Sequence, residues 1–397
     1  MTQTAQQNRS VELSIWAMAM GNFAAGMSSL VIAGVLTDIA ADLGVSVGTA
    51  GQLVTIYTLV YGIGAPIVIA LTSRFDRKFM LTVGMGFILV GSSVAIFANS
   101  YALLFGARII AAFGSAAFVP LAAAVAIALV SEEQRGRATS IVFSGFSLSS
   151  ALGLPIGAYI GLTFGWRFTF VAIVVIALIG GILVWTQLPQ GIQTPPVNLA
   201  IFRRVFRHSL LMVVLAVTIL QFGGQMALFA FIGPWLQALT NLEANGISIV
   251  LFITGIGGIV GTYLSGFSVD RIGARATQLI FIVALVVIML FLPVIQASLV
   301  IGVILMFLWS GVGQGFIPPQ LVRIADVGPE LSTAALSLNS AFINVGLALG
   351  AFTGGFYIDN IGVETVSYLG AGGAFLATFI FGLSWVMESR ANQSQSS

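Results

Sequence analysis

Residues Ser144 to Gly161 read SGFSLSSALGLPIGAYIG and lie within a charge-free run from Ala138 to Trp166. About 20 apolar residues in a helix cross a bilayer core, so this run is long enough to span a membrane. Glycines spaced by four make a flat stripe on which a neighbouring membrane helix packs closely, and a proline bends such a helix. The stretch therefore predicts a membrane helix in close contact with a neighbour, or else ordinary small-residue packing, and the residues concerned are Gly145, Gly153, Pro155, Gly157 and Gly161.

The composition excludes a soluble globular protein. Of 397 residues, 58% are hydrophobic and only 7% are charged, whereas average soluble proteins carry about 25% charged residues. There is no cysteine and only one histidine, His208. We therefore predict no metal site and no cofactor, and no enzymatic constellation of histidine with a nucleophile or carboxylates.

Charge-free runs divide the chain into an all-α membrane protein of twelve spans. The run 276–322 is too long for one span and is divided at Gln296–Ser298, while a turn at Asn99–Ser100 places Arg108 inside the fourth span. We read the first run as a retained span, because it is too long for the core of a signal peptide. The runs are 13–37, 43–73, 79–107, 109–131, 138–166, 168–202, 208–242, 244–269, 276–322, 331–358 and 365–387.

The basic residues predict the orientation of the spans. Placing the N-terminus in the cytoplasm leaves Arg167 as the only basic residue in an outer loop. This distribution follows the positive-inside rule, so both termini are predicted to be cytoplasmic.

The composition of the loops predicts that the chain is divided into two halves and a tail. Pro195–Pro196 and a basic cluster mark a cytoplasmic linker at 189–209. We predict six-helix bundles at 1–188 and 210–388 and a disordered polar tail at 389–397.

Short matches between the halves indicate an internal duplication. Ala151-Leu152-Gly153 matches Ala348-Leu349-Gly350, at an offset of 197 positions. Similar pairs join 73–75 to 270–272 and 118–120 to 316–318 at nearly the same offset. Parallel repeats of this kind build many secondary transporters.

Four stretches resemble the major facilitator superfamily. Residues 266–275, GFSVDRIGAR, closely resemble its G-x-x-x-D-R-x-G-x-R/K loop signature. The first-half copy at 69–78 departs from it, with Ser73 in place of Asp and Asp76 in place of Gly. Residues 108–114 resemble its fourth-span arginine motif, and 145–157 resemble the fifth-span motif of its exporters.

The resemblance implies the twelve-span drug:proton antiporter class, with two pseudo-symmetric six-helix bundles in the major facilitator fold. Residues 34–40 and 165–168 further resemble bacterial efflux permeases for purines and nucleosides, arabinose-type sugars or chloramphenicol.

Charged loop residues are candidates for a conformational gate. Bridges from a loop to neighbouring helix ends stabilise one state and break in the other; the alternative is that these residues only set topology. The candidates are Arg74, Asp76, Arg77, Lys78, Asp270, Arg271 and Arg275.

Arg108 lies about 9 Å into the predicted membrane core. Charged residues at such depth usually face a cavity, so we predict a role in substrate anchoring or proton transfer; snorkelling to the outer interface is the alternative. No acidic residue is predicted in the middle of a span, and Asp38, at the outer end of the first span, is the nearest proton-coupling candidate, with an exposed helix-end acid as the alternative.

In the fold that the resemblance implies, the first, fourth, seventh and tenth spans line a central cavity. Amide side chains there suit a neutral or zwitterionic ligand with a heteroaromatic or hydroxyl edge. The predicted lining residues are Asn22, Ser29, Arg108, Gln221, Gln225, Trp309 and Gln314, with Asn339 and Asn344 from the eleventh span.

Together these features predict a monomeric, multi-pass protein of the bacterial cytoplasmic membrane that exports a small organic molecule in exchange for protons and does not bind nucleic acid. The alternative is a facilitator or proton symporter that imports a nucleoside or sugar.

Overall fold

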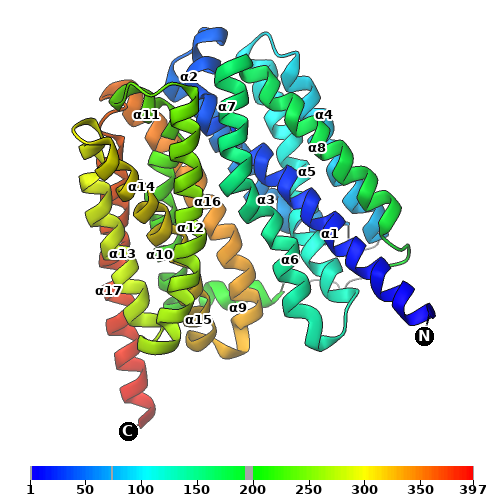
Figure 1. Ribbon diagram of the computed structural model, residues 1–397. Helices are drawn as coiled ribbons and strands as arrows, with labels where there is room; N and C mark the ends of the chain where they lie inside the picture. Colours follow the sequence, from blue (N-terminus) through cyan, green and yellow to red (C-terminus); the bar gives the residue numbers. More distant parts are fainter. Residues whose placement is uncertain (1, 73–74, 193–199, 397) are drawn as a thin grey trace. The chain divides into compact units, whose positions relative to one another are not determined.

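The structure, a computed structural model, describes residues 2–72, 75–192 and 200–396, and every regular element in that part of the chain is a helix (Figure 1). Within it, eleven helices are long and apolar enough to cross a membrane, and the bent pair Ser10–Leu30 and Ile32–Leu43 makes a twelfth span. The predicted twelve-span membrane fold is confirmed. The predicted orientation of the termini stays a prediction.

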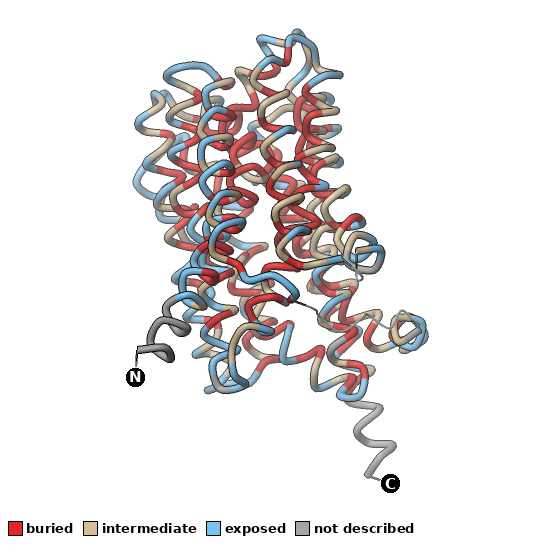
Figure 2. The backbone as a smooth tube through the Cα atoms, turned by 90° about the vertical axis from the view of Figure 1, so that its right-hand side faces the viewer, coloured by how far each residue is buried: buried red, intermediate tan, exposed pale blue. Residues whose placement is uncertain are grey.

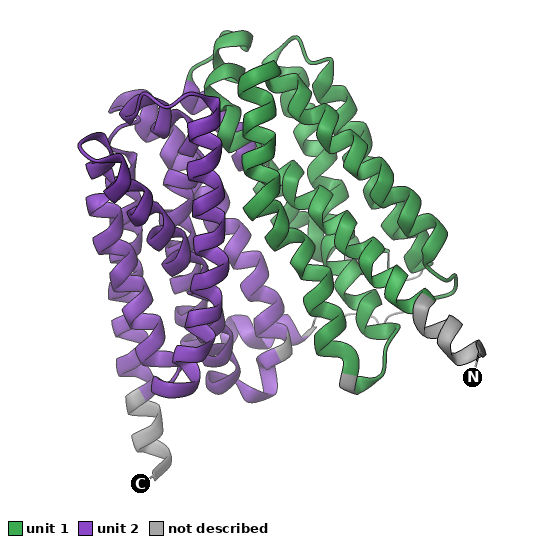
Figure 3. Ribbon diagram, in the orientation of Figure 1, with its two compact units in different colours: residues 1–46, 56–197 green, residues 47–55, 198–397 purple. Residues whose placement is uncertain are grey.

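The chain divides into two compact units, residues 1–46 with 56–197 and residues 47–55 with 198–397 (Figure 3). The division falls within the predicted linker, except that the first residues of the second span group with unit 2. The elements of the first half are α1 (Thr2–Leu30), α2 (Ile32–Leu43), α3 (Val47–Leu71), α4 (Arg77–Ile96), α5 (Tyr101–Ala128), the short 3₁₀ helix Glu132–Gln134, α6 (Arg135–Leu148), the π-helical turn Ser149–Gly153, α7 (Leu154–Phe164) and α8 (Trp166–Gln187).

The second half has the same order of spans. Pro195 and Pro196, which predicted the break between the halves, lie outside the described residues. The elements are α9 (Ala200–Arg207), α10 (Ser209–Phe229), α11 (Ile232–Leu239), α12 (Ala244–Ile272), α13 (Ala274–Phe291), the 3₁₀ helix Leu292–Gln296, α14 (Leu299–Gln314), α15 (Ile317–Val327), the 3₁₀ helix Pro329–Leu331, α16 (Ser332–Asn360) and α17 (Val366–Ser396).

The first and seventh spans break at corresponding positions, which supports the predicted duplication. Val35 has φ −124° and ψ 18° inside α2, and Phe231 has φ −116° and ψ 22° at the start of α11. The first span bends by 44° where α1 meets α2. Such breaks leave helix carbonyls without their usual intrahelical donors.

The glycines of the fifth span pack it against the first, as the stripe at 145–161 predicts. A Cβ on Gly145 would lie 1.9 Å from the Ala19 carbonyl oxygen, and one on Gly157 would lie 2.0 Å from Val31 Cγ2. At Gly153 the nearest atom is an ordinary 3.4 Å away. The close approach therefore rests on Gly145, Gly157 and Gly161, where a Cβ would lie 2.4 Å from Val35 Cγ1.

The eleventh and seventh spans repeat this contact in unit 2. A Cβ on Gly350 would lie 2.1 Å from the Gly223 carbonyl oxygen, and one on Gly354 would lie 2.7 Å from that of Ala227. Here backbone meets backbone, because both helices contribute small residues at the crossing.

Pro155 acts differently from a simple proline kink. The Leu154 amide bonds to the carbonyl of Ser149, five residues back, so a π-helical turn precedes the proline. A π-turn inserts one extra residue and rearranges the local hydrogen bonds. The fifth span therefore continues through Pro155 as α7.

Buried and exposed residues alternate along the helices, and the exposed ones include many large apolar side chains (Figure 2). Large apolar side chains such as Phe379 and Val300 remain 71% exposed, as expected of surfaces that face lipid. The predicted disorder of the tail at 389–397 stays a prediction.

Candidate functional site

Arg108 is buried in unit 1, with 1% of its surface exposed. Its Nη1 donates a hydrogen bond of 2.6 Å to the backbone carbonyl of Ser28. Its guanidinium lies 4.0 Å from the centroid of the Tyr57 ring. The side chain therefore points into the unit and does not snorkel, and it places a positive charge at the end of α1, where the first span bends.

Tyr57 connects this arginine to three helices. Its hydroxyl donates to the Ala25 carbonyl at 3.3 Å and lies 2.6 Å from the hydroxyl of Ser115. A desolvated cation–π contact contributes up to about 2 kcal/mol. The tyrosine thus fixes the position of Arg108 between α1, α3 and α5.

The other predicted residues of unit 1 lie on α1. Asn22 is fully buried, and its Nδ2 donates to the Val142 carbonyl at 2.9 Å, which ties α1 to α6. Ser29 is half-buried and directly follows Ser28, the partner of Arg108. The structure thus brings Ser29 and Arg108 to the same bend, whereas Asn22 bonds across helices.

Gln221 and Gln225 lie one helical turn apart on α10 and are both buried, with exposures of 0% and 6%. Among the described residues, neither amide atom of Gln221 has a hydrogen-bond partner, and Oε1 of Gln225 also has none. An unsatisfied buried polar group costs about 1–3 kcal/mol. Native proteins retain such groups where a ligand, an ion or water completes their hydrogen bonds.

Trp309 of α14 joins this group. It is fully buried, its indole Nε1 has no partner among the described residues, and its ring centroid lies 6.2 Å from that of Phe229. Gly313, one turn further along, leaves room for Gln225, since a Cβ there would lie 2.1 Å from Nε2. We call Gln221, Gln225 and Trp309 the amide–indole cluster.

Of the remaining predicted residues of unit 2, Asn339 and Asn344 already have hydrogen-bond partners within the unit, and Gln314 packs beside another helix. Asn339 accepts a hydrogen bond from Thr218 at 2.8 Å. Asn344 donates to the Ser340 carbonyl of its own helix at 2.9 Å. Gln314 lies beside α12, where a Cβ on Gly258 would be 3.1 Å from its Cγ. The structure therefore does not bring these three into the amide–indole cluster.

Asp38, the proton-coupling candidate, is half-buried in α2. Its neighbour Asp42 has a defined role one turn later: Oδ2 pairs with Arg167 Nη1 at 2.8 Å and accepts from Trp166 Nε1 at 3.2 Å. Arg167 also donates to the Ala98 carbonyl at 2.7 Å. These contacts join α2 to the start of α8, and we call them the Asp42–Arg167 contacts.

The first-half loop departs from the signature in structure as well as in sequence. Ser73 and Arg74 lie outside the described residues. Asp76 caps α4 by accepting from the Phe79 amide at 3.1 Å, and it also accepts from the Gly191 amide at 2.6 Å. Arg77 is buried and donates to the Thr72 carbonyl at 3.0 Å. The ammonium of Lys78 lies 5.3 Å from the Trp185 ring centroid.

The second-half loop has a glycine where its backbone requires one. Gly273 has a φ of +82°, which an L side chain rarely adopts, so glycine is required at this position. Among the described residues, Asp270 forms no ion pair with Arg271 or with Arg275. Arg271 lies over the Phe267 ring at 4.1 Å instead. Arg275 pairs with Glu388 at 2.6 Å because that carboxylate is buried beside it.

Sequence reasoning missed the buried charges at the end of the tenth and twelfth spans. Arg323 and Glu388 have side-chain exposures of 2% and 3% and lie 2.5 Å apart. Each stands at the boundary of a charge-free run, where a charge is ordinarily solvated. The opposite signs at two predicted inner ends were the available signal, but only the fold shows that the residues meet.

Twelve membrane-crossing helices built on a repeated order, with buried polar groups on several spans, define a multi-pass membrane transporter. The sequence profile of the Major Facilitator Superfamily matches residues 18–330. The chain belongs to this superfamily.

Bacterial relatives resemble the chain over nearly its whole length. It is 32% identical to the uncharacterized MFS-type transporter YtbD of Bacillus subtilis (strain 168), over 97% of this chain and 98% of the relative. It is 30% identical to the uncharacterized MFS-type transporter YbcL of the same organism, over 91% and 93%. The inner membrane transport protein YdhP of Escherichia coli (strain K12) is 29% identical over 93% and 95%.

Solved structures confirm the fold. A crystal structure of a D-xylose-proton symporter superposes with a TM-score of 0.77 at 17% identity, covering 92% of this chain and 96% of that one. A crystal structure of the human organic anion transporter MFSD10 superposes with a TM-score of 0.68 at 16% identity, covering 94% of this chain and 99% of that one.

Proposed function

We propose that the protein is a secondary active transporter that exports a small neutral organic molecule across the bacterial cytoplasmic membrane in exchange for protons. The family and the relatives support membrane transport. The observation that carries export is the fifth span, where Gly145 and Gly157 press against α1 and where the sequence resembles the motif of exporters.

The amide–indole cluster supports a neutral substrate. Gln221 offers both a donor and an acceptor, Gln225 offers an acceptor, and Trp309 offers a donor beside an aromatic surface. Neither α10 nor α14 contains a charged residue. A planar compound with adjacent donor and acceptor atoms, such as a lactam or a nucleobase, complements these groups.

Arg108 and Asp38 are the proposed participants in proton coupling. Arg108 binds the bend between α1 and α2, and Asp38 lies on α2 beyond that bend. A change of charge at either residue therefore acts on the same flexible point of the first span.

The test uses the full chain in liposomes that contain a pH-sensitive dye. Purines, nucleosides, pentoses, chloramphenicol and cationic dyes are added singly across an imposed pH gradient. Proton flux opposite to one compound supports antiport and identifies the substrate class. A compound that moves with no proton flux overturns antiport and favours a facilitator, and proton flux in the same direction favours a symporter.

The second candidate, import or facilitated movement, is favoured by one observation. The acidic residues of the described chain lie at or near the ends of the membrane spans, and Asp38 lies five residues before the end of the first span. Membrane proton relays normally contain a carboxylate or histidine within a span.

A further inference from the structure

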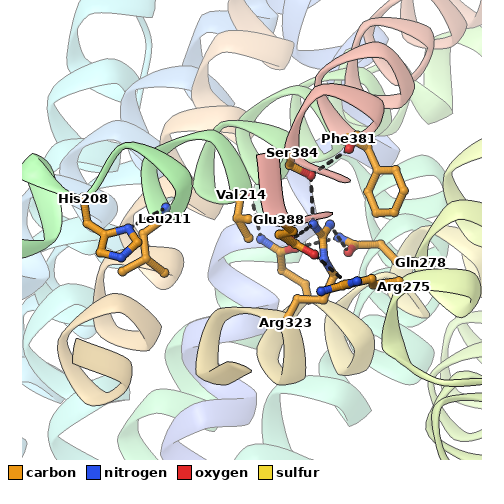
Figure 4. A network of polar contacts seen from close by, with 10 residues as sticks. His208, Leu211, Val214, Arg275, Gln278, Arg323, Phe381, Ser384 and Glu388 are labelled. Carbon is orange, nitrogen blue, oxygen red and sulfur yellow. Dashed lines mark hydrogen bonds and ion pairs between the residues drawn. The ribbon is translucent and has the colours of Figure 1, made fainter. Parts of the chain in front are cut away.

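A continuous chain of buried polar contacts begins at Glu388, in the last turn of the twelfth span (Figure 4). Its carboxylate binds Arg323 through Oε1 at 2.5 Å and Arg275 through Oε2 at 2.6 Å. Arg323 also donates to the Ser384 hydroxyl at 2.8 Å. Glu388 and Arg323 are almost fully buried, whereas Arg275 is 41% exposed.

The chain continues from Arg323 across the unit to α10. Arg323 Nη1 donates to Gln278 Oε1 at 2.8 Å, and Gln278 Nε2 donates to Gln320 Oε1 at 2.6 Å. Gln320 Nε2 then donates to the Val214 carbonyl at 2.9 Å and to the Thr218 hydroxyl at 2.7 Å. These contacts connect α17, α15, α13 and α10.

Arg323 at one end of this chain and the Val214 carbonyl at the other fix the direction of the bonds between them. A guanidinium only donates, so the Gln278 side chain must present its oxygen to Arg323 and its amino group to Gln320. Gln320 must then present its own amino group to α10, where its two N–H groups hold Val214 and Thr218. Thr218 in turn donates to Asn339.

The contact on α10 lies next to the amide–indole cluster. Val214, Thr218, Gln221 and Gln225 recur at helical spacing along one stripe of α10. Two hydrogen bonds from Gln320 to this stripe restrain the rotation of the helix about its axis. The orientation of Gln221 and Gln225 therefore depends on a hydrogen-bonded network that extends from α10 to Arg323.

The opposite end of the network reaches the signature loop. Arg275 follows Gly273, the residue with positive φ in that loop, and its partly exposed side chain is the accessible partner of Glu388. We propose that Glu388 and Arg323 are positioning residues that couple the loop 266–275 to the orientation of α10. The inference rests on the proposed function only in taking α10 as part of the substrate path.

The test measures hydrogen–deuterium exchange of residues 209–229 and the thermal midpoint of the full chain in lipid nanodiscs. Glu388→Gln leaves two arginines without their carboxylate and should lower the midpoint. The double variant Glu388→Gln/Arg323→Met removes the buried charge and should recover stability, because a buried ion pair is often replaceable by apolar groups.

Exchange in α10 distinguishes positioning from packing. In the double variant we expect exchange of residues 209–229 to stay about two- to thirtyfold faster than in the parent, the range that corresponds to typical coupling free energies of 0.5–2 kcal/mol. Recovery of both stability and α10 protection would show that the network only packs the unit and would overturn the proposal.

A second variant keeps the test decisive if the double variant remains unstable. Arg275→Ala leaves the Arg323–Glu388 pair intact and removes only the partner of Glu388 Oε2. The midpoint should therefore fall less than in Glu388→Gln, while α10 exchange rises. Unchanged α10 exchange in this variant would overturn the coupling to the loop.

The matched control is Glu330→Gln, which removes an exposed carboxylate 3.4 Å from Arg204 in the same unit and should change neither the thermal midpoint nor the exchange of α10. Neither measurement requires the substrate, so the outcome is independent of the transport assay.

Discussion

Arg108 Nη1 and the carbonyl oxygen of Ser28 lie 2.6 Å apart, so a charged side chain of α5 binds the end of α1 where the first span bends. The last carbonyls of a helix have no intrahelical donor and carry a partial negative charge. Arg108 satisfies one of these carbonyls and complements that charge. The conformation of the first span at its bend therefore depends on the positive charge of Arg108.

Replacing Arg108 with alanine should lower transport about tenfold or more, because a hydrogen bond from a charged donor contributes about 1.5–3 kcal/mol. Arg108→Lys should recover only part of the loss, since lysine keeps the charge but not the planar group over Tyr57. Flux in liposomes measures both variants. Full activity of Arg108→Ala would return this residue to a purely structural role.

Gly157→Leu should separate α7 from the first span and abolish transport without preventing membrane insertion. The added side chain meets Val31 at once, and overpacking of this kind costs about 1–3 kcal/mol. Gly86→Leu in α4 is the matched control, because a Cβ there meets no atom within 4 Å. Thermal stability and flux are compared for the pair, and equal behaviour would refute the packing argument.

Gln221→Ala should weaken substrate binding without lowering stability, because it removes two buried polar atoms that have no hydrogen-bond partner among the described residues. Gln320→Ala should lower the free energy of unfolding by about 1–3 kcal/mol, because its partners would lose their hydrogen bonds. Substrate titration and thermal unfolding distinguish the two. A destabilised Gln221→Ala variant would contradict the assignment of its amide to a ligand.

Asp38→Asn should reduce the proton release that follows addition of substrate, if this carboxylate carries the proton. The measurement is the pH change of lightly buffered purified protein on mixing with the transported compound. Glu243→Gln is the control, because Glu243 is an exposed acid at the start of α12. Proton release that is unaffected in Asp38→Asn would exclude Asp38 as the carrier.

Asp42→Asn should affect stability only slightly. The Asp42–Arg167 pair is 44% and 37% exposed, and ion pairs of that kind contribute about 0–1 kcal/mol. Its contribution should fall further at high salt, because exposed charges are screened. Thermal midpoints of the parent and the variant at low and high salt measure this contribution. A large fall in the midpoint that does not depend on salt would show that the Asp42–Arg167 contacts are a main source of stability for α2.

Most of the fold was predictable because a bilayer restricts the choice of structure. Each backbone polar group must be satisfied inside lipid, so a long apolar run becomes a helix. The runs between charges located the spans, and Asn99–Ser100 placed the turn before α5, where Ser100 caps the helix. The glycine stripe at 145–161 likewise predicted a close helix contact before its partner, α1, was known.

The sequence predicted which types of residue form the candidate site, but it predicted less well which individual residues belong to it. In the part of the chain that the structure describes, Gln221, Gln225 Oε1 and Trp309 Nε1 have no hydrogen-bond partner, whereas Asn339 and Asn344 bond within their unit. Side-chain chemistry alone cannot distinguish these cases, because a buried amide is equally suited to a ligand and to a neighbouring helix. The pairing of Arg275 with Glu388 rather than Asp270 was unpredictable for the same reason.

Apolar length, the positions of charges and repeated motifs are properties of the chain, so a duplicated, twelve-span membrane protein follows from them alone. Which polar groups meet depends on how the helices pack. Arg323 and Glu388 are distant in sequence and stand at ordinary span ends, yet they pair inside unit 2 and direct a hydrogen-bonded network to α10. Hydrogen bonds depend on distances of about 3 Å, and such distances arise only when the helices have packed.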